Sequence, residues 1–165
     1  MQTSGEINTG DSGKTISTEF FRDADAFWAH SLRLYDVPGV ADRLIRAQDS
    51  TGMDVNMALL LGWLEGFGLE PAGDVFEALG AASRHWHKGI LADVRARRRK
   101  MKGQPGYDVV KKQELKLERA AQKALIRALG GKAVKGTATL SQYLEALGLQ
   151  ADEARALHAH LITRP

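Results

Sequence analysis

The fold of this chain is decided by residues 48–64, which read QDSTGMDVNMALLLGWL. Gly52 can adopt the left-handed conformation that ends a helix, and Asp54 can accept hydrogen bonds from the free amides that begin the next one. From Val55 to Phe67 the apolar residues leave almost no polar face, which is typical of a helix buried on all sides. We therefore predict a central buried helix over 55–67.

Apolar residues at helical spacing predict further helices on both sides of this segment. The predicted ranges are 23–36, 38–51, 71–101, 107–129, 139–147 and 151–161. No stretch shows the alternating pattern of a strand over a useful length. The predicted fold class is all-α, a helical bundle of about five main helices with a C-terminal helical hairpin, and the two basic helices over 71–101 and 107–129 are expected to lie antiparallel.

Helical spacing also predicts which side chains face inward. In the long helix over 71–101 the predicted inward residues are Val75, Leu79, Ala82, Trp86, Ile90 and Val94. Trp28, Trp63 and Trp86 each fall on an apolar stripe, so we expect all three in the core. Thr139 with Gln142 has the spacing of a capping box at the start of a helix.

Three regions are expected along the chain. Residues 1–18 are rich in Gly, Ser and Thr and lack periodicity, which predicts a flexible N-terminal tail. Residues 19–130 are predicted to form the bundle domain. Residues 131–165 are predicted to be a linker and the C-terminal hairpin, packed on the bundle.

Composition excludes several classes of protein. The 165 residues include no cysteine, which excludes disulfides, cysteine-based metal sites and thiol nucleophiles. No run is long and apolar enough for a membrane span, and residues 1–18 contain no apolar signal-peptide segment. We expect a cytoplasmic protein without a membrane partner.

Charge is distributed unevenly along the chain. Residues 84–135 contain sixteen basic and four acidic residues, whereas the rest contains seven basic and sixteen acidic residues. The predicted basic surface consists of Arg95, Arg98, Arg99, Lys100, Lys102, Lys112, Lys116 and Arg119. Such a surface is often only solvated, but it also suits an acidic surface of a partner protein. Nucleic acid is a possible partner through phosphate contacts, although no aromatic residues interleave to stack on bases.

A polar cluster precedes the central helix and predicts a buried network or a pocket. Its members are Gln48, Asp49, Asp54 and Asn56. A carboxylate at position 49 opposes the dipole of the preceding helix, so we expect an arginine of the basic helices to compensate it. Asn56 is expected to be a buried hydrogen-bonding residue. A structural role is favoured, and a binding pocket for a small molecule or an enzyme site is the alternative.

Histidine spacing gives no metal site. His85 and His87 are two residues apart, as are His158 and His160, so on a helix each pair points to nearly opposite sides. Glu114 and Glu118 share a helix face, and we expect them to pair with Lys111, Lys116 or Arg119. No catalytic residue, metal or cofactor is predicted.

Several spaced motifs together resemble a known family. They are Phe27-Trp28, Ser31-Leu32, Tyr35, Pro38-Gly39-Val40, Gln48-Asp49, Gly52, Asp54-Val55-Asn56 and Trp63, followed by Trp86 with Arg95, Arg98, Arg99, Met101 and Lys102, and by Glu114-Leu115 with Glu118. Over residues 25–130 this pattern is similar to that of a proteobacterial family of uncharacterised proteins. This sequence departs from the family pattern at Ala92-Asp93, where the family usually has Pro-Leu. The resemblance implies no known activity.

The sequence therefore favours a non-enzymatic protein-interaction or adaptor module with a basic face. Nucleic-acid binding and a small-molecule or enzyme site at the polar cluster are the alternatives.

Overall fold

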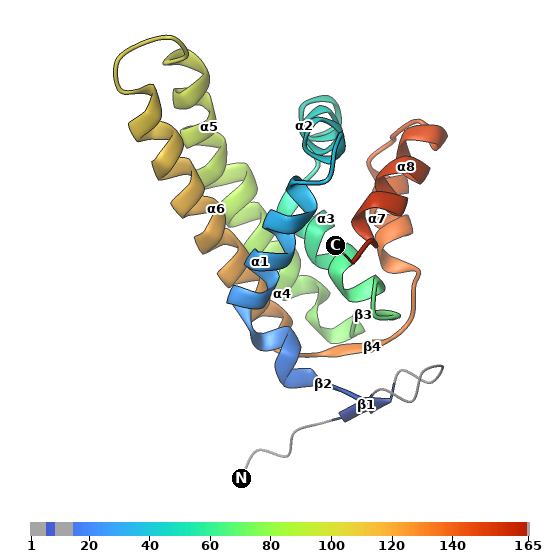
Figure 1. The fold of residues 1–165 in the computed structure, drawn as a ribbon. Helices are drawn as coiled ribbons and strands as arrows, with labels where there is room; N and C mark the ends of the chain where they lie inside the picture. The colour runs from blue at the N-terminus through green and yellow to red at the C-terminus, as the bar shows by residue number, and fades with distance from the viewer. Residues whose placement is uncertain (1–5, 9–14, 165) are drawn as a thin grey trace.

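The computed structural model describes residues 6–8 and 15–164 and confirms the all-α class (Figure 1). The α-helices are α1 Ala24–Tyr35, α2 Val40–Thr51, α3 Val55–Glu65, α4 Phe76–His85, α5 Leu91–Lys100, α6 Tyr107–Leu129, α7 Thr139–Ala146 and α8 Ala151–Leu161. A π-helical turn, Trp86–Ile90, joins α4 to α5, and short 3₁₀ turns cover Thr18–Arg22 and Gly73–Val75. In the part of the chain described, no helix is long and apolar enough to cross a membrane.

The central helix α3 begins as predicted. The Asp54 carboxylate accepts hydrogen bonds from the amides of Asn56 at 3.0 Å and Met57 at 3.3 Å. Gly52, with a φ of 75°, ends α2 in the left-handed conformation. All residues of α3 from Val55 to Leu64 are buried. The helix ends at Glu65 rather than at the predicted Phe67. A tight turn over residues 66–68 then leads to the strand that begins at Leu69.

The main core surrounds α3, and we call the elements that share it the body: α1–α4, α7, α8 and the C-terminal part of α6. α7 and α8 contribute Leu140, Leu144, Leu157 and Leu161 to this same core. A β-carbon at Gly62 of α3 would lie 2.8 Å from the carbonyl carbon of Leu161, so glycine allows α8 to pack closely. The division into a domain over 19–130 and a hairpin over 131–165 stays a prediction.

Two short antiparallel ladders were not predicted. β3 Leu69–Pro71 pairs with β4 Ala133–Lys135, and β1 Glu6–Asn8 pairs with β2 Thr15–Ser17. Each strand has three residues, which is too short for a recognisable alternation. The β3–β4 pair ties the turn after α3 to the turn after α6. The predicted flexible tail over 1–18 lies largely outside the described residues.

The predicted capping box at Thr139 is wrong. The carboxylate of Glu70 in β3 instead accepts hydrogen bonds from the backbone amides of Ala138 at 2.9 Å and Thr139 at 3.2 Å. The Thr139 hydroxyl also donates to Glu70, at 3.1 Å. A distant acidic residue therefore caps α7, because the β3–β4 pairing brings it there.

The antiparallel pairing of the two basic helices is confirmed, and they project from the body as a hairpin (Figure 1). We call this hairpin, residues 91–121, the arm. It has a small core of its own, in which Leu91, Val94, Val110 and Ala121 are buried and Met101 and Leu117 pack against them.

The π turn shifts the inward face of the long helix by one residue. We predicted Trp86 and Ile90 to face inward, but they are only partly buried, whereas His87 and Leu91 are buried. A π turn inserts an extra residue into the helical repeat and so rotates the positions after it. Val94 is nevertheless buried as predicted. The shift turns Arg95 inward as well.

Candidate functional site: a groove between the arm and the body

A groove of about 840 Å³ separates the arm from α1 and α2. Its apolar lining comes from four helices and includes Trp28, Leu32, Tyr35, Ile45, Val55 and Leu115. Leu32, Ile45 and Leu115 are 46%, 49% and 55% exposed. Trp28, Leu32 and Tyr35 of α1 thus share the face that lines the groove. The core expectation for Trp28 is wrong, since it is only partly buried, while Trp63 is in the core as predicted.

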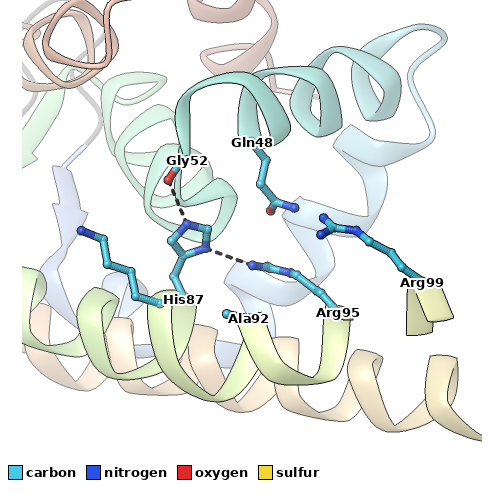
Figure 2. A pocket seen from close by; sticks show the side chains of 7 residues that line it. Gln48, Gly52, His87, Ala92, Arg95 and Arg99 are labelled. Carbon is cyan, nitrogen blue, oxygen red and sulfur yellow. Dashed lines mark hydrogen bonds between the residues drawn. The ribbon is translucent and has the colours of Figure 1, made fainter. Parts of the chain in front are cut away.

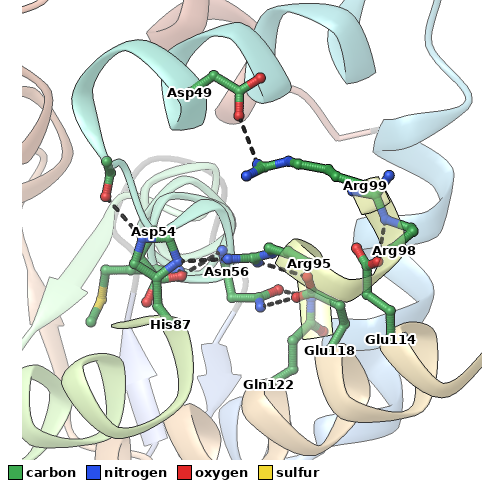
Figure 3. A network of polar contacts seen from close by, with 12 residues as sticks. Asp49, Asp54, Asn56, His87, Arg95, Arg98, Arg99, Glu114, Glu118 and Gln122 are labelled. Carbon is green, nitrogen blue, oxygen red and sulfur yellow. Dashed lines mark hydrogen bonds and ion pairs between the residues drawn. The ribbon is translucent and has the colours of Figure 1, made fainter. Parts of the chain in front are cut away.

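A buried polar network joins the arm to the body at this groove (Figure 3). The Glu118 carboxylate of α6 accepts a hydrogen bond from Arg95 Nη2 of α5 at 2.7 Å and another from Asn56 Nδ2 of α3 at 2.6 Å. Arg95 is 5% exposed and Asn56 is 4% exposed. One carboxylate therefore links two arm helices to the first turn of the central helix, and the predicted buried role of Asn56 is confirmed.

Gln122 extends this network beneath α1. Its Nε2 donates to Asn56 Oδ1 at 3.1 Å and to the Ser31 hydroxyl at 3.0 Å, and Ser31 donates to the Phe27 carbonyl. The Gln122 Oε1 is buried and has no hydrogen-bond partner within the described residues. The network therefore ends on an unsatisfied acceptor.

His87 fixes the other side of Arg95. Its Nε2 lies 2.9 Å from the carbonyl oxygen of Gly52, so Nε2 carries the proton and donates to it. Its Nδ1 then accepts a hydrogen bond from Arg95 Nη1 at 3.0 Å. The Arg95 guanidinium is thus held between a neutral imidazole and a carboxylate.

Two further ion pairs lie along the groove. Arg98 of α5 pairs with Glu114 of α6, and both side chains are partly buried. Arg99 Nη2 lies 3.3 Å from Asp49 Oδ1, which confirms the prediction that an arginine of the basic helices compensates this carboxylate. Both groups of the Arg99 pair are more than half exposed, so the pair is worth little to stability.

Tyr35 faces the same carboxylates across the groove. Burial of the hydroxyl raises the pKa of Tyr35 above its ordinary range, and the charge of Glu118 acts in the same direction. The hydroxyl therefore remains protonated and available as a hydrogen-bond donor at physiological pH.

The four predicted polar-pocket residues do not form one pocket. Gln48, Asp49 and Asn56 line the groove. Asp54 does not line the groove. Its carboxylate oxygens instead accept hydrogen bonds from the first amides of α3 and, at 2.6 Å, from the Ser83 hydroxyl.

The predicted basic surface also divides in two. Arg95 is buried and is not part of the exposed basic surface, because the π turn rotates it toward the groove and the body. Arg119 pairs with Asp25 at 2.9 Å and lies over the Trp28 ring at 5.7 Å. The exposed members that have no ion pair with another described residue are Lys100, Lys102, Lys112 and Lys116.

Sequence reasoning missed His87 and Gln122 as site residues, and it assigned the wrong partners to the two acidic residues of α6. Glu114 and Glu118 pair with Arg98 and Arg95 rather than with Lys111, Lys116 or Arg119. Positions 114, 118 and 122 repeat every four residues, so a polar stripe on one face of α6 was the available signal.

The pair His85 and His87 separates as its spacing predicts. His87 is buried while His85 is exposed, and His158 pairs with Glu65 at 2.7 Å. Over the described residues, no group of three or more His, Asp and Glu side chains is arranged to hold a metal ion.

A second, smaller cavity of about 330 Å³ adjoins the groove (Figure 2). Gln48, Arg95 and Arg99 line both this cavity and the groove. The remaining lining comes from Gly52 of the body and from His87, Lys88 and Ala92 of the π turn and α5.

Fold and site together define a small helical protein in which a projecting hairpin and a bundle enclose a groove. The family model for a protein of unknown function (DUF2390) matches residues 26–125, and the chain belongs to this family. The matched residues include every residue that lines the groove. No curated protein and no solved structure matches the chain.

Proposed function

We propose that the protein is an interaction module whose groove binds an amphipathic helical segment of another protein. The observation that carries the proposal is the set of exposed apolar side chains, Leu32, Ile45 and Leu115, that three helices bring to one groove. Contiguous apolar surface on a small protein commonly marks an interaction site. A groove between helices suits the apolar face of a partner helix.

The charges of the groove favour an acidic partner. The carboxylates of Asp49, Glu114 and Glu118 are already paired with arginines of α5. Lys111 and Lys112 line the groove and have no ion pair with any residue described. Free positive charge at the rim attracts a partner that carries Asp or Glu beside its apolar residues.

Site-specific photo-crosslinking in the native cell tests this proposal. A photo-reactive amino acid at Leu115 should capture one protein reproducibly, through a segment that contains both apolar and acidic residues. Phe76 is the matched control, because it is 45% exposed and does not line the groove. Identical adducts from both positions, or none from Leu115, would contradict the proposal.

Reversing the charge of the groove lysines distinguishes specific binding of an acidic partner from nonspecific hydrophobic association. Lys111→Glu with Lys112→Glu should reduce the crosslink yield at Leu115 severalfold, because both side chains line the groove. Lys123→Glu with Arg127→Glu changes the net charge equally at positions that do not line the groove and should leave the yield unchanged.

Nucleic-acid binding is the second candidate, favoured by the exposed and unpaired lysines of the arm. Lys100, Lys102 and Lys116 could each neutralise a backbone phosphate and release counterions. In a mobility-shift titration at two salt concentrations, a salt-sensitive shift that is lost in Lys100→Glu with Lys102→Glu would support this candidate. Arg98 is unsuitable for this test, since it is paired with Glu114.

A further inference from the structure

The smaller cavity has a chemistry that differs from the groove. Three of its lining residues, Lys88, Arg95 and Arg99, are cationic, and no acidic side chain lines it. The carboxylates that pair with the two arginines, Glu118 and Asp49, line the groove instead. The cavity lining is therefore cationic, and Lys88 is its one cation without an ion pair among the described residues.

We propose that this cavity binds a small organic anion whose carboxylate or phosphate group lies between the guanidinium groups of Arg95 and Arg99. Figure 2 shows the side-chain ends of Gln48, Arg95 and Arg99 converging on one space. Planar guanidinium groups suit the oxygens of carboxylate and phosphate, and the Gln48 amide adds a further donor.

The recognition groups are held in place before a ligand arrives. Arg95 is 5% exposed and is fixed by hydrogen bonds to His87 at 3.0 Å and to Glu118 at 2.7 Å. These bonds use two of the five N–H donors of its guanidinium, so others remain for an anion. A preorganised donor loses little conformational entropy on binding.

The volume decides the size of the ligand. About 330 Å³ is more than an inorganic phosphate fills and lies at the lower end of small-molecule sites. The ligand is therefore an organic anion of few carbon atoms. Its cavity shares Gln48, Arg95 and Arg99 with the groove. The partner helix is proposed from Leu32, Ile45 and Leu115, which do not line the cavity, so either proposal can fail without the other.

Isothermal titration calorimetry on the full chain in low-salt buffer tests the anion site. The probes are glycerol 3-phosphate and succinate, with inorganic phosphate and acetate as the minimal groups and chloride as the ionic-strength control. Binding of the phosphates alone identifies a phosphate-bearing ligand, and binding of the carboxylates alone identifies a carboxylate-bearing one. If none of the four probes binds more tightly than chloride, the proposal is overturned.

A pair of double variants shows whether binding occurs in this cavity. Lys88→Gln with Arg99→Gln removes two lining cations without touching buried Arg95, and should weaken binding by about tenfold or more. Lys100→Gln with Lys102→Gln removes the same charge outside the cavity and should change the Kd less than about twofold. Equal weakening by both variants would overturn the site.

The His87 ring supplies a readout that nonspecific anion binding does not move. The probe should change the ¹⁵N chemical shift of the His87 imidazole, which lines the cavity, while leaving exposed His85 unchanged. Equal shifts of both rings would contradict the assignment.

Discussion

The body and the arm are built by different means. Eleven of the twelve largest fully buried side chains of the described residues lie in the body core, and Leu91 alone lies in the arm. The arm instead meets the body through Arg95, Glu118, Asn56 and Gln122. Apolar burial supplies most of the stability of a fold, so the body carries the stability of the molecule.

The polar contact between arm and body fixes geometry more than it adds stability. A buried ion pair with its hydrogen bonds contributes little compared with well-packed apolar residues of the same volume, but losing one partner is costly. Here the contact joins the arm to the body beside the groove and the smaller cavity. Four predictions separate the two regions, from the largest expected effect to the smallest.

Removing the Glu118 carboxylate should be the most damaging change. Glu118→Ala leaves the buried Arg95 charge without its partner and Asn56 without an acceptor, so the free energy of unfolding should fall by about 3–5 kcal/mol in urea denaturation. Arg95→Met combined with Glu118→Leu should recover most of this loss. A loss no larger than that of Glu114→Ala, whose ion pair is partly solvated, would contradict the assignment.

Equal truncations should cost more in the body than in the arm. Leu60 of α3 is fully buried, so Leu60→Ala should lower the free energy of unfolding by about 2–5 kcal/mol. Leu117 packs against the arm core but is only partly buried, so Leu117→Ala should cost about 1 kcal/mol. Equal losses in thermal or urea unfolding would show that the arm core matters as much as the body core.

His30 should make the body sensitive to acid. Burial, with a smaller contribution from Arg33, lowers the pKa of His30 from 6.5 to about 4. Because the unfolded chain binds this proton more readily, the associated stability is complete above pH 6.5 and is lost as the pH falls toward 4. The loss is roughly 3 kcal/mol.

Urea denaturation between pH 7.5 and 4.5 measures this effect. His30→Leu should remove that part of the pH dependence, and His85→Leu, at an exposed position, should retain it. Parallel pH profiles for the wild type and His30→Leu would contradict the role of His30.

The Glu70 cap should have the smallest of these effects. Glu70→Ala removes the acceptor for the first amides of α7 and should cost about 1 kcal/mol, as for other lost helix caps. Glu145→Ala, an exposed residue of the same helix, should change the stability by less than about 0.5 kcal/mol.

Local chemistry was sufficient to predict much of the body. Gly52 and Asp54 define the start of α3 through backbone conformation and capping, both of which depend on neighbouring residues. The cap of α7 could not be predicted, because Glu70 is far away in sequence and arrives through a strand pairing of three residues.

The candidate site was predicted only in part, for a similar reason. The polar cluster before the central helix predicted a pocket, and three of its residues, Gln48, Asp49 and Asn56, line the groove. His87 was missed and Arg95 was misplaced, because helical spacing counts 3.6 residues per turn and the π turn at Trp86–Ile90 adds one residue. The partners of Glu114 and Glu118 depend on that same shift.

Native-state hydrogen exchange tests the contrast between body and arm most directly. Amides of α3 should exchange only through global unfolding. Amides of α5 and of the first half of α6 should open at a free energy lower by roughly 1–3 kcal/mol, because a smaller core protects them. If α5 and α3 exchange with the same opening free energy, the arm is not a separate unit and the division of roles proposed for the molecule is wrong.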